Sequence, residues 1–294
     1  NLTAYHEMGI NRLSIGLQSA DNEELKQLGR IHSFEDFLQT YEYVIKSGFN
    51  NVNVDLMSAI PLQTVESYQN TLEKVLSLEP APTHISAYSL IIEEGTFFYE
   101  NTPVLPDEDT DRELYKITND ILRKNGYHRY EISNYAKEGY ECRHNKVYWK
   151  RGDYVGFGIG AASLVENRRF SNIRDREQYV ECMEGAGNAI KEQEEILSAD
   201  EQMEEYMFLG LRLTQGVSKE AFQRTFGREL DEVYPGLVKR LEEQGLMTCK
   251  KSAGNQETYL ADLCHPNEFG RYKVGRLVYE HLVKWSHEEE TVEV

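Results

Sequence analysis

Apolar residues in the first half of the chain alternate between short runs typical of strands and longer stretches with helical spacing. Short runs at residues 12–19, 52–57 and 84–91 predict three strands. The helical pattern between and after them occupies residues 34–47, 64–77 and about 111–125. Strands that alternate with helices of this length predict βαβ units, a parallel sheet and an α/β fold.

Helical patterns dominate the last third of the chain. Three predicted helices and then two predicted strands occupy residues 204–213, 218–226, 230–244, 246–251 and 257–263. Helices followed by a hairpin are typical of a winged helix, which often binds DNA, but the acidic character of these helices favours a small packing or partner-binding domain. We expect two domains, a barrel-like region at 1–190 and a winged-helix-like region at 191–294.

Composition narrows the function classes. The chain has 32 Lys and Arg against 50 Asp and Glu, a formal net charge of −18. This balance argues against a nucleic-acid partner, because phosphate binding needs a basic face. No run approaches the roughly 18 apolar residues of a membrane helix, so we expect no integral membrane segment. The four cysteines are scattered without a CxxC spacing, which favours a reducing, cytoplasmic compartment.

Polar residues close to the ends of the predicted strands are the first candidate site. In barrel-type α/β folds the active groups lie at the carboxyl ends of the strands, and this rule selects Gln18, Asp55 and the Tyr88–Ser89 pair. The alternative is that each is a polar residue that ends a strand or begins a turn. Three strands cannot close a barrel of about six to eight, so the sheet is open or its first strands lie upstream.

The segment 142–149 (CRHNKVYW) is the second candidate. An imidazole can ligate haem iron, aromatic faces can pack against a macrocycle, and the neighbouring cations Arg143, Lys150 and Arg151 can pair with propionates. The alternative is a turn in which Asn145 caps backbone groups and Trp149 anchors the core. A GxGxG run at residues 156–160 has no convincing long helix after it, which favours close backbone packing over dinucleotide binding.

Several motifs resemble one family. GINRLSIGLQS at 9–19, LGRIH at 28–32, VDLM at 54–57 and ISAYSL at 85–90 are similar to the second half of a radical S-adenosylmethionine (SAM) barrel, in the group related to oxygen-independent coproporphyrinogen III oxidase. HNxxYW at 144–149, followed by GDY, resembles the haem-chaperone (HemW) branch of that group. The resemblance covers nearly the whole chain in order.

The resemblance implies a fold and a set of site residues. The fold would be the carboxyl-terminal half of a partial TIM-like (β/α)6 barrel, strands 4 to 6, followed by a small α+β winged-helix-like domain. The positions expected to approach SAM are Gln18, Arg30 and Asp55, with Ser89 as a backbone contact to the adenine. The residues expected to bind haem are His144, as the candidate iron ligand, with Tyr148, Trp149 and Arg143.

Three departures from the family pattern bear on function. The family's glycine before Leu-Pro is Ala59 here, and its GAHS is Gly160-Ala161-Ala162-Ser163, which lacks a histidine near the porphyrin region. The CxxxCxxC motif that holds the [4Fe–4S] cluster is also absent. The resemblance therefore implies that the cluster cysteines lie upstream in a full-length parent, and that this chain has no catalytic residues of its own for radical chemistry.

Three functions remain open at this point. The first is a haem chaperone that binds haem and transfers it to haem-requiring proteins, with SAM and the cluster bound by the full-length parent. The second is an oxygen-independent coproporphyrinogen III dehydrogenase, which decarboxylates propionate side chains. The third is a protein-interaction module that uses the acidic winged-helix-like part. Whether the protein is an enzyme, and its oligomeric state, also stay open.

Overall fold

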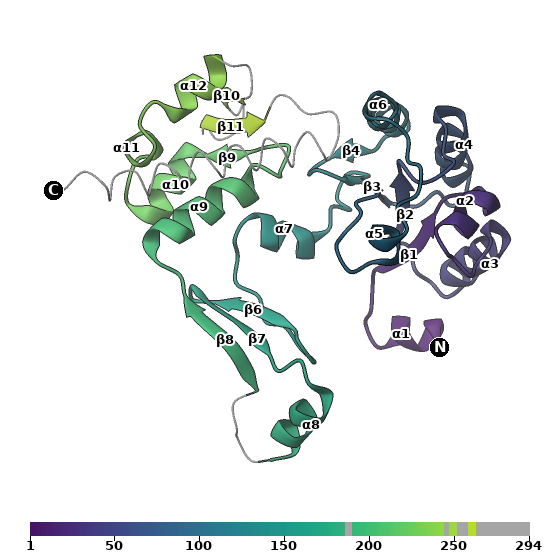
Figure 1. The fold of residues 1–294 in the computed structure, drawn as a ribbon, viewed down its shortest axis with the longest axis horizontal. Coiled ribbons are helices and arrows are strands. Elements are labelled where there is room, and N and C mark those ends of the chain that lie inside the picture. Colours follow the sequence, from purple (N-terminus) through teal and green to yellow (C-terminus); the bar gives the residue numbers. More distant parts are fainter. Residues whose placement is uncertain (186–189, 244–246, 252–257, 263–294) are drawn as a thin grey trace. The chain divides into compact units, whose positions relative to one another are not determined.

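The structure is a computed structural model that describes residues 1–185, 190–243, 247–251 and 258–262. By compactness it divides into two units, the first covering Asn1–Glu141 and the second beginning at Cys142 (Figure 1). The predicted domains, 1–190 and 191–294, stay a prediction. No helix in the described ranges is long and apolar enough to cross a membrane.

The first unit is built on a five-stranded sheet in the order β1-β2-β3-β5-β4. Strands β1 (Leu13–Gln18), β2 (Val52–Ser58) and β3 (His84–Ser89) are parallel neighbours. Strands β5 (Asn134–Ala136) and β4 (His128–Arg129) continue the sheet in antiparallel pairing. The predicted α/β fold class with a parallel sheet is confirmed, and the three parallel strands lie within two residues of the predicted runs.

Six helices accompany this sheet in the described part of the first unit. They are α1 (Leu2–Glu7), α2 (Asn22–Gln27), α3 (Phe34–Lys46), α4 (Val65–Leu76), α5 (Phe97–Glu100) and α6 (Glu108–Lys124). Side-chain caps fix where the long helices begin. Ser33 and Asp36 form a capping box at α3, Thr64 and Ser67 form one at α4, and the Asp107 carboxylate caps α6.

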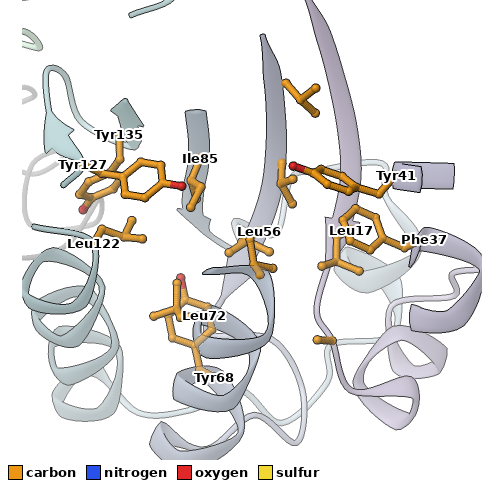
Figure 2. Close-up of a cluster of buried hydrophobic side chains, with 14 of the residues drawn as sticks. Leu17, Phe37, Tyr41, Leu56, Tyr68, Leu72, Ile85, Leu122, Tyr127 and Tyr135 are labelled. Carbon is orange, nitrogen blue, oxygen red and sulfur yellow. The ribbon is translucent and has the colours of Figure 1, made fainter. Parts of the chain in front are cut away.

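The core lies between one face of the sheet and helices α3, α4 and α6 (Figure 2). Because successive strand residues point to opposite faces, alternate positions such as Leu17, Leu56 and Ile85 meet the helices, and each is fully buried. Tyr68 and Leu72 of α4 pack beneath them. Burial of each large apolar side chain contributes about 1.5–3 kcal/mol to the free energy of folding. The packing of helices on this face therefore stabilises the sheet, and polar residues occupy the opposite face.

The second unit begins with helix α7 (Arg143–Trp149) and a three-stranded antiparallel sheet. The strands are β6 (Ala162–Val165), β7 (Arg168–Asn172) and β8 (Lys191–Ile196), and α8 (Arg176–Glu184) lies between the last two in sequence. Neither the sheet nor α7 was predicted, because charged side chains interrupt the apolar pattern in both. The turn around Asn145, given as the alternative for this segment, is wrong, because the segment is helical.

The rest of the second unit follows the winged-helix order. The elements are α9 (Ala199–Gly210), β9 (Val217–Ser218), α10 (Lys219–Phe226), α11 (Leu230–Val233), α12 (Leu237–Glu243), β10 (Met247–Lys251) and β11 (Thr258–Asp262). The single helix predicted over 230–244 is wrong, because the helix is interrupted between α11 and α12. Pro235 has no N–H to donate, and Gly236 takes a left-handed φ of 69°.

Candidate binding sites at the strand ends and on helix α7

The face of the β1–β3 sheet opposite the helices is polar. Alternation along the strands places on it Ser14 from β1, Asn53 and Asp55 from β2, and His84 and Ser86 from β3. Register pairs Ser14 with Asn53 and Asn53 with His84 as direct neighbours. These five side chains form one hydrogen-bonded group, which we call the strand-face network.

Asp55 is the half-buried carboxylate of this network. Its Oδ2 accepts a hydrogen bond from Ser14 Oγ at 3.0 Å, and its Oδ1 accepts one from Asn53 Nδ2 at 2.7 Å. Asn53 Nδ2 also donates to Ser14 Oγ at 2.6 Å. A carboxylate has about four acceptor positions, so Asp55 retains lone pairs for hydroxyl or amino groups of a ligand.

His84 is the neighbour of Asn53 on strand β3 and is fully buried. Its Nδ1 is 2.6 Å from Asn53 Oδ1, and its Nε2 is 2.8 Å from the Tyr130 hydroxyl. Burial, and then the positive charge of Arg12, lower the pKa of His84 to about 3. His84 is therefore a neutral imidazole at physiological pH.

Gln18 ends β1 at an irregularity of the ladder, with a φ of 73°. Its side chain is only 5% exposed, and its Oε1 accepts a hydrogen bond from the Tyr88 hydroxyl at 3.2 Å. The structure thus joins two of the residues that the strand-end rule selected. Asp55 pairs with Gly16 and Ser86 in the register of the sheet, two residues before Gln18 on β1 and before Tyr88 on β3.

Ser89 and Arg30, the other two residues predicted to approach SAM, do not belong to these hydrogen-bonded groups. Ser89 Oγ donates to Asp111 Oδ1 at 2.8 Å and lies 3.1 Å from Ser58 Oγ, so its side chain is turned to helix α6. This geometry leaves only the backbone of Ser89 for a ligand contact. Arg30 is exposed after α2, its N–H donates to the Leu25 carbonyl, and its guanidinium forms no ion pair with any described residue.

A buried acid that the sequence did not single out joins the loops after β1 and β2. The Glu24 carboxylate, 2% exposed, accepts hydrogen bonds from Ser19 Oγ at 2.6 Å, Ser67 Oγ at 2.5 Å and Gln63 Nε2 at 3.2 Å. Nothing in the pattern of an acidic helix distinguishes this glutamate from its exposed neighbours. Its contacts fix the two loops that follow Gln18 and Asp55.

Helix α7 places two of the predicted haem residues one turn apart. Tyr148 Oη lies 3.0 Å from His144 Nε2, and the two rings meet edge to face with centroids 4.8 Å apart. Residues four apart share one face of a helix, which explains the contact. Tyr154 packs on the other side of Tyr148 at 4.6 Å. His144 and Arg143 are exposed, whereas Tyr148 is half-buried.

Trp149 packs beneath a cation and keeps an unused donor. The Arg212 guanidinium lies over its ring at 4.5 Å, and the buried Nε1 has no hydrogen-bond partner in the described part of the chain. The Trp149 ring is therefore held in place at the end of α7, and its Nε1 proton is still available.

Arg151 is not one of the free cations near His144. Its Nε donates to Glu205 Oε2 at 3.0 Å and its Nη1 to Asn167 Oδ1 at 2.8 Å. Arg169 Nη2 donates to the other oxygen of Glu205 at 2.5 Å, and Glu205 is buried. The cations left for propionates beside His144 are the exposed Arg143 and Lys150.

The glycine run is used for backbone packing, as predicted. A Cβ on Gly156 would lie 2.3 Å from the Ala162 carbonyl oxygen, and Gly158 and Gly160 take positive φ values. Asn172 Nδ2 donates to the Gly158 carbonyl at 2.8 Å. Only glycine permits this approach at Gly156, so the glycine serves close backbone packing.

A metal cluster does not fit the described residues. They contain no group of three or more His, Cys, Asp or Glu side chains that could hold a metal ion. The printed sequence also has no CxxxCxxC motif.

The chain is similar to two family models and to several curated proteins. The radical SAM superfamily model matches residues 1–75, and the HemN C-terminal domain model matches residues 197–253. The heme chaperone HemW of Bacillus subtilis (strain 168) is 38% identical over 251 residues, which cover 84% of this chain and 65% of the relative. The heme chaperone HemW of Escherichia coli (strain K12) is 33% identical over 250 residues, 83% of this chain and 64% of the relative.

The chain thus spans just under two thirds of the length of these curated relatives. Among solved structures, the coproporphyrinogen III oxidase HemN from Escherichia coli, described as a radical SAM enzyme, is similar with a TM-score of 0.74. The alignment covers 96% of this chain and 66% of that one at 19% identity. This likeness concerns the fold, and it agrees with a partial barrel followed by a second unit.

Proposed function

We propose that this chain, which belongs to the HemN-like family of the radical SAM superfamily, acts as a haem chaperone that binds haem and passes it to haem-requiring proteins. The observation that carries the proposal is helix α7, whose paired His144 and Tyr148 occur in a chain 33–38% identical to relatives named heme chaperone HemW. We further propose a cytoplasmic location and no nucleic-acid partner, consistent with the sparse cysteines and the acidic balance.

The residues of α7 fit haem. With the proton of His144 on Nε2 and directed at Tyr148 Oη, the lone pair of Nδ1 is free for iron. The tyrosine then fixes the ring as a second partner of the ligating imidazole. Arg143 and Lys150 are exposed cations for the propionates, and the Tyr148 and Trp149 rings supply apolar surface for the macrocycle.

The strand ends fit SAM. Asp55 has lone pairs for ribose hydroxyls, Gln18 presents an amide at the end of β1, and exposed Arg30 has a free guanidinium for the methionine carboxylate. Ser89 contributes its backbone toward the adenine. When bound, SAM would supply an adenosyl group and a sulfonium beside this face of the sheet.

Full-length members of the superfamily bind SAM and a [4Fe–4S] cluster. The residues described here do not fit the cluster, so we assign it to full-length members only and derive no step from it. The alternative function, coproporphyrinogen III dehydrogenase, would require radical cleavage of SAM. A regulatory or structural use of SAM and the cluster agrees better with a haem chaperone.

Haem transfer is the test of this function. The protein is loaded with haem, freed of excess by gel filtration, and mixed with an apo-haem protein whose spectrum differs. We expect the Soret band of the acceptor to appear. In a separate assay, the full-length parent with its cluster reconstituted is supplied with SAM and coproporphyrinogen, and we expect it to form neither 5′-deoxyadenosine nor a decarboxylated porphyrin. Formation of both products would favour the dehydrogenase, and failure to transfer haem would contradict the chaperone role.

A further inference from the structure

The strand-face network continues below Asp55 as one ordered chain of hydrogen bonds. It runs from Tyr130 Oη to His84, from His84 Nδ1 to Asn53 Oδ1, and from Asn53 Nδ2 to Asp55 Oδ1. The distances are 2.8, 2.6 and 2.7 Å. Asn53 and His84 are both buried, with 2% and 0% of their surface exposed. Water therefore does not compete for these bonds.

Each member of this chain determines the proton placement of the next. An ionised Asp55 only accepts, so Asn53 must present its NH2 group there and its carbonyl to His84. A carbonyl only accepts, so His84 must carry its proton on Nδ1. A neutral imidazole with Nδ1 protonated has an accepting Nε2, which the Tyr130 hydroxyl satisfies.

A second branch holds the other oxygen of Asp55. Ser14 Oγ accepts from Asn53 Nδ2 and donates to Asp55 Oδ2, so the same amide group orients both carboxylate contacts. Ser86 Oγ donates to Asn53 Oδ1 at 3.2 Å, which favours the same orientation of the amide, with its oxygen toward β3. The Asp55 carboxylate is therefore held from two sides by groups on its own strand and on β1.

We propose that His84 and Asn53 are positioning residues, which hold the Asp55 carboxylate in one orientation and leave its remaining lone pairs for the vicinal hydroxyls of a nucleoside ligand. The inference rests on the proposed SAM role of Asp55. His84 touches no ligand in this account. It acts through Asn53, as a neutral ring whose Nδ1–H donates to the Asn53 carbonyl and whose Nε2 accepts from the Tyr130 hydroxyl.

The test uses the full chain and the probe S-adenosylhomocysteine, titrated by calorimetry. Asp55→Asn removes the negative charge and replaces one acceptor oxygen by a donor, so it should weaken binding at least about tenfold, the effect of losing roughly one hydrogen bond to a charged group. His84→Gln places its amide near the position of Nε2 and loses the donor to Asn53, so it should weaken binding by about fivefold or more. His84→Asn places a donor near Nδ1 and should restore binding to within about twofold.

A double-mutant cycle separates positioning from general damage. On the Asp55→Asn background, His84→Gln should cause no further loss, because the two residues act on one contact. Nitrogen NMR of the wild-type imidazole should show His84 protonated on Nδ1 and not on Nε2. Ser14→Ala, an exposed change, should weaken binding in the same direction if His84→Gln does not fold.

The failures are distinguishable. If Asp55→Asn weakens binding but neither His84→Gln nor Ser14→Ala does, or if NMR finds the Nε2 proton, the positioning role is overturned and the SAM site stands. If the wild type does not bind S-adenosylhomocysteine, or if Asp55→Asn binds as well as the wild type, the SAM assignment is overturned together with this inference.

Discussion

Individual side chains on the polar face of the sheet have distinct tasks. Asp55 has unused acceptor positions, whereas Asn53 and His84 are buried and fully used in hydrogen bonds to it or beneath it. A buried polar group that lost its partner would cost about 1–3 kcal/mol. The network is therefore stable only while each proton stays where its neighbours require it.

The imidazole of His84 makes stability depend on pH. Its pKa is lowered from 6.5 to about 3 by burial and by Arg12, so the unfolded chain takes up a proton that the folded chain does not. The contribution of His84 to the free energy of unfolding is complete above pH 6.5 and is lost as the pH falls from there toward 3. Between pH 7 and 5 the loss should be about 2 kcal/mol.

Urea unfolding at both pH values measures this effect, with His84→Asn as the comparison. The variant keeps a hydrogen-bond donor but cannot titrate. We expect its loss of stability between pH 7 and 5 to be smaller than that of the wild type by about 2 kcal/mol. Equal losses of stability in the two proteins would show that folded His84 takes up a proton between pH 7 and 5, and would contradict the lowered pKa.

One residue close to the predicted site illustrates what sequence alone can assign. Ala59, noted as a departure from the family's glycine, takes a φ of 55°, the left-handed region that favours glycine. The backbone conformation thus explains why the family has a glycine at this position. The motif could not show that Ser89 turns its hydroxyl to Asp111, since that depends on a helix 22 residues away.

At the scale of elements, the end of helix α7 is fixed by a buried ion cluster. Glu205 on α9 holds Arg151, which follows α7, and Arg169 on β7. Arg151 takes a φ of 53° and also donates to Asn167 in the turn between β6 and β7. The cluster thereby joins helix α7, the proposed haem-binding helix, to the β6–β8 sheet and to helix α9 of the second unit.

Glu205→Gln should destabilise the second unit. Removing the negative charge leaves the buried Arg151 guanidinium without a counter-charge, at a cost of about 3 kcal/mol. Urea unfolding followed by tryptophan fluorescence reports on it, because Trp149 lies in the same unit under Arg212.

A matched control is an exposed pair on the neighbouring strands. Arg168 and Glu194 lie 3.5 Å apart with both side chains largely in water, so Glu194→Gln should change stability by less than about 1 kcal/mol. A Glu205→Gln variant no less stable than Glu194→Gln would contradict the structural role of the cluster.

The elements were predictable where a repeating pattern was strong. The three parallel strands and helices α3, α4 and α6 follow directly from apolar spacing and caps. The sheet β6-β7-β8 was missed because β8, with sequence KEQEEI, is mostly charged and exposed, and is held by pairing with β7 alone. The break after α11 could have been found from Pro235 and Gly236.

At the scale of the whole molecule, the two proposed sites are chemically different and lie in two separate units. The polar strand face in the first unit offers acceptors and an amide, which suit a nucleoside. Helix α7 in the second offers one exposed imidazole beside aromatic rings and cations. Sequence motifs predicted both sites, and these stay predictions. The hydrogen bond from Arg151 to Glu205 joins segments over 50 residues apart and was not predictable.

Haem binding at His144 is the central claim, and absorption spectroscopy tests it most directly. Haem is titrated into the wild type, His144→Ala and His128→Ala, the last being another partly exposed histidine, paired with Glu141 in the first unit. We predict a shifted Soret band in the wild type and in His128→Ala that is lost in His144→Ala. An unchanged Soret spectrum in His144→Ala would contradict the account.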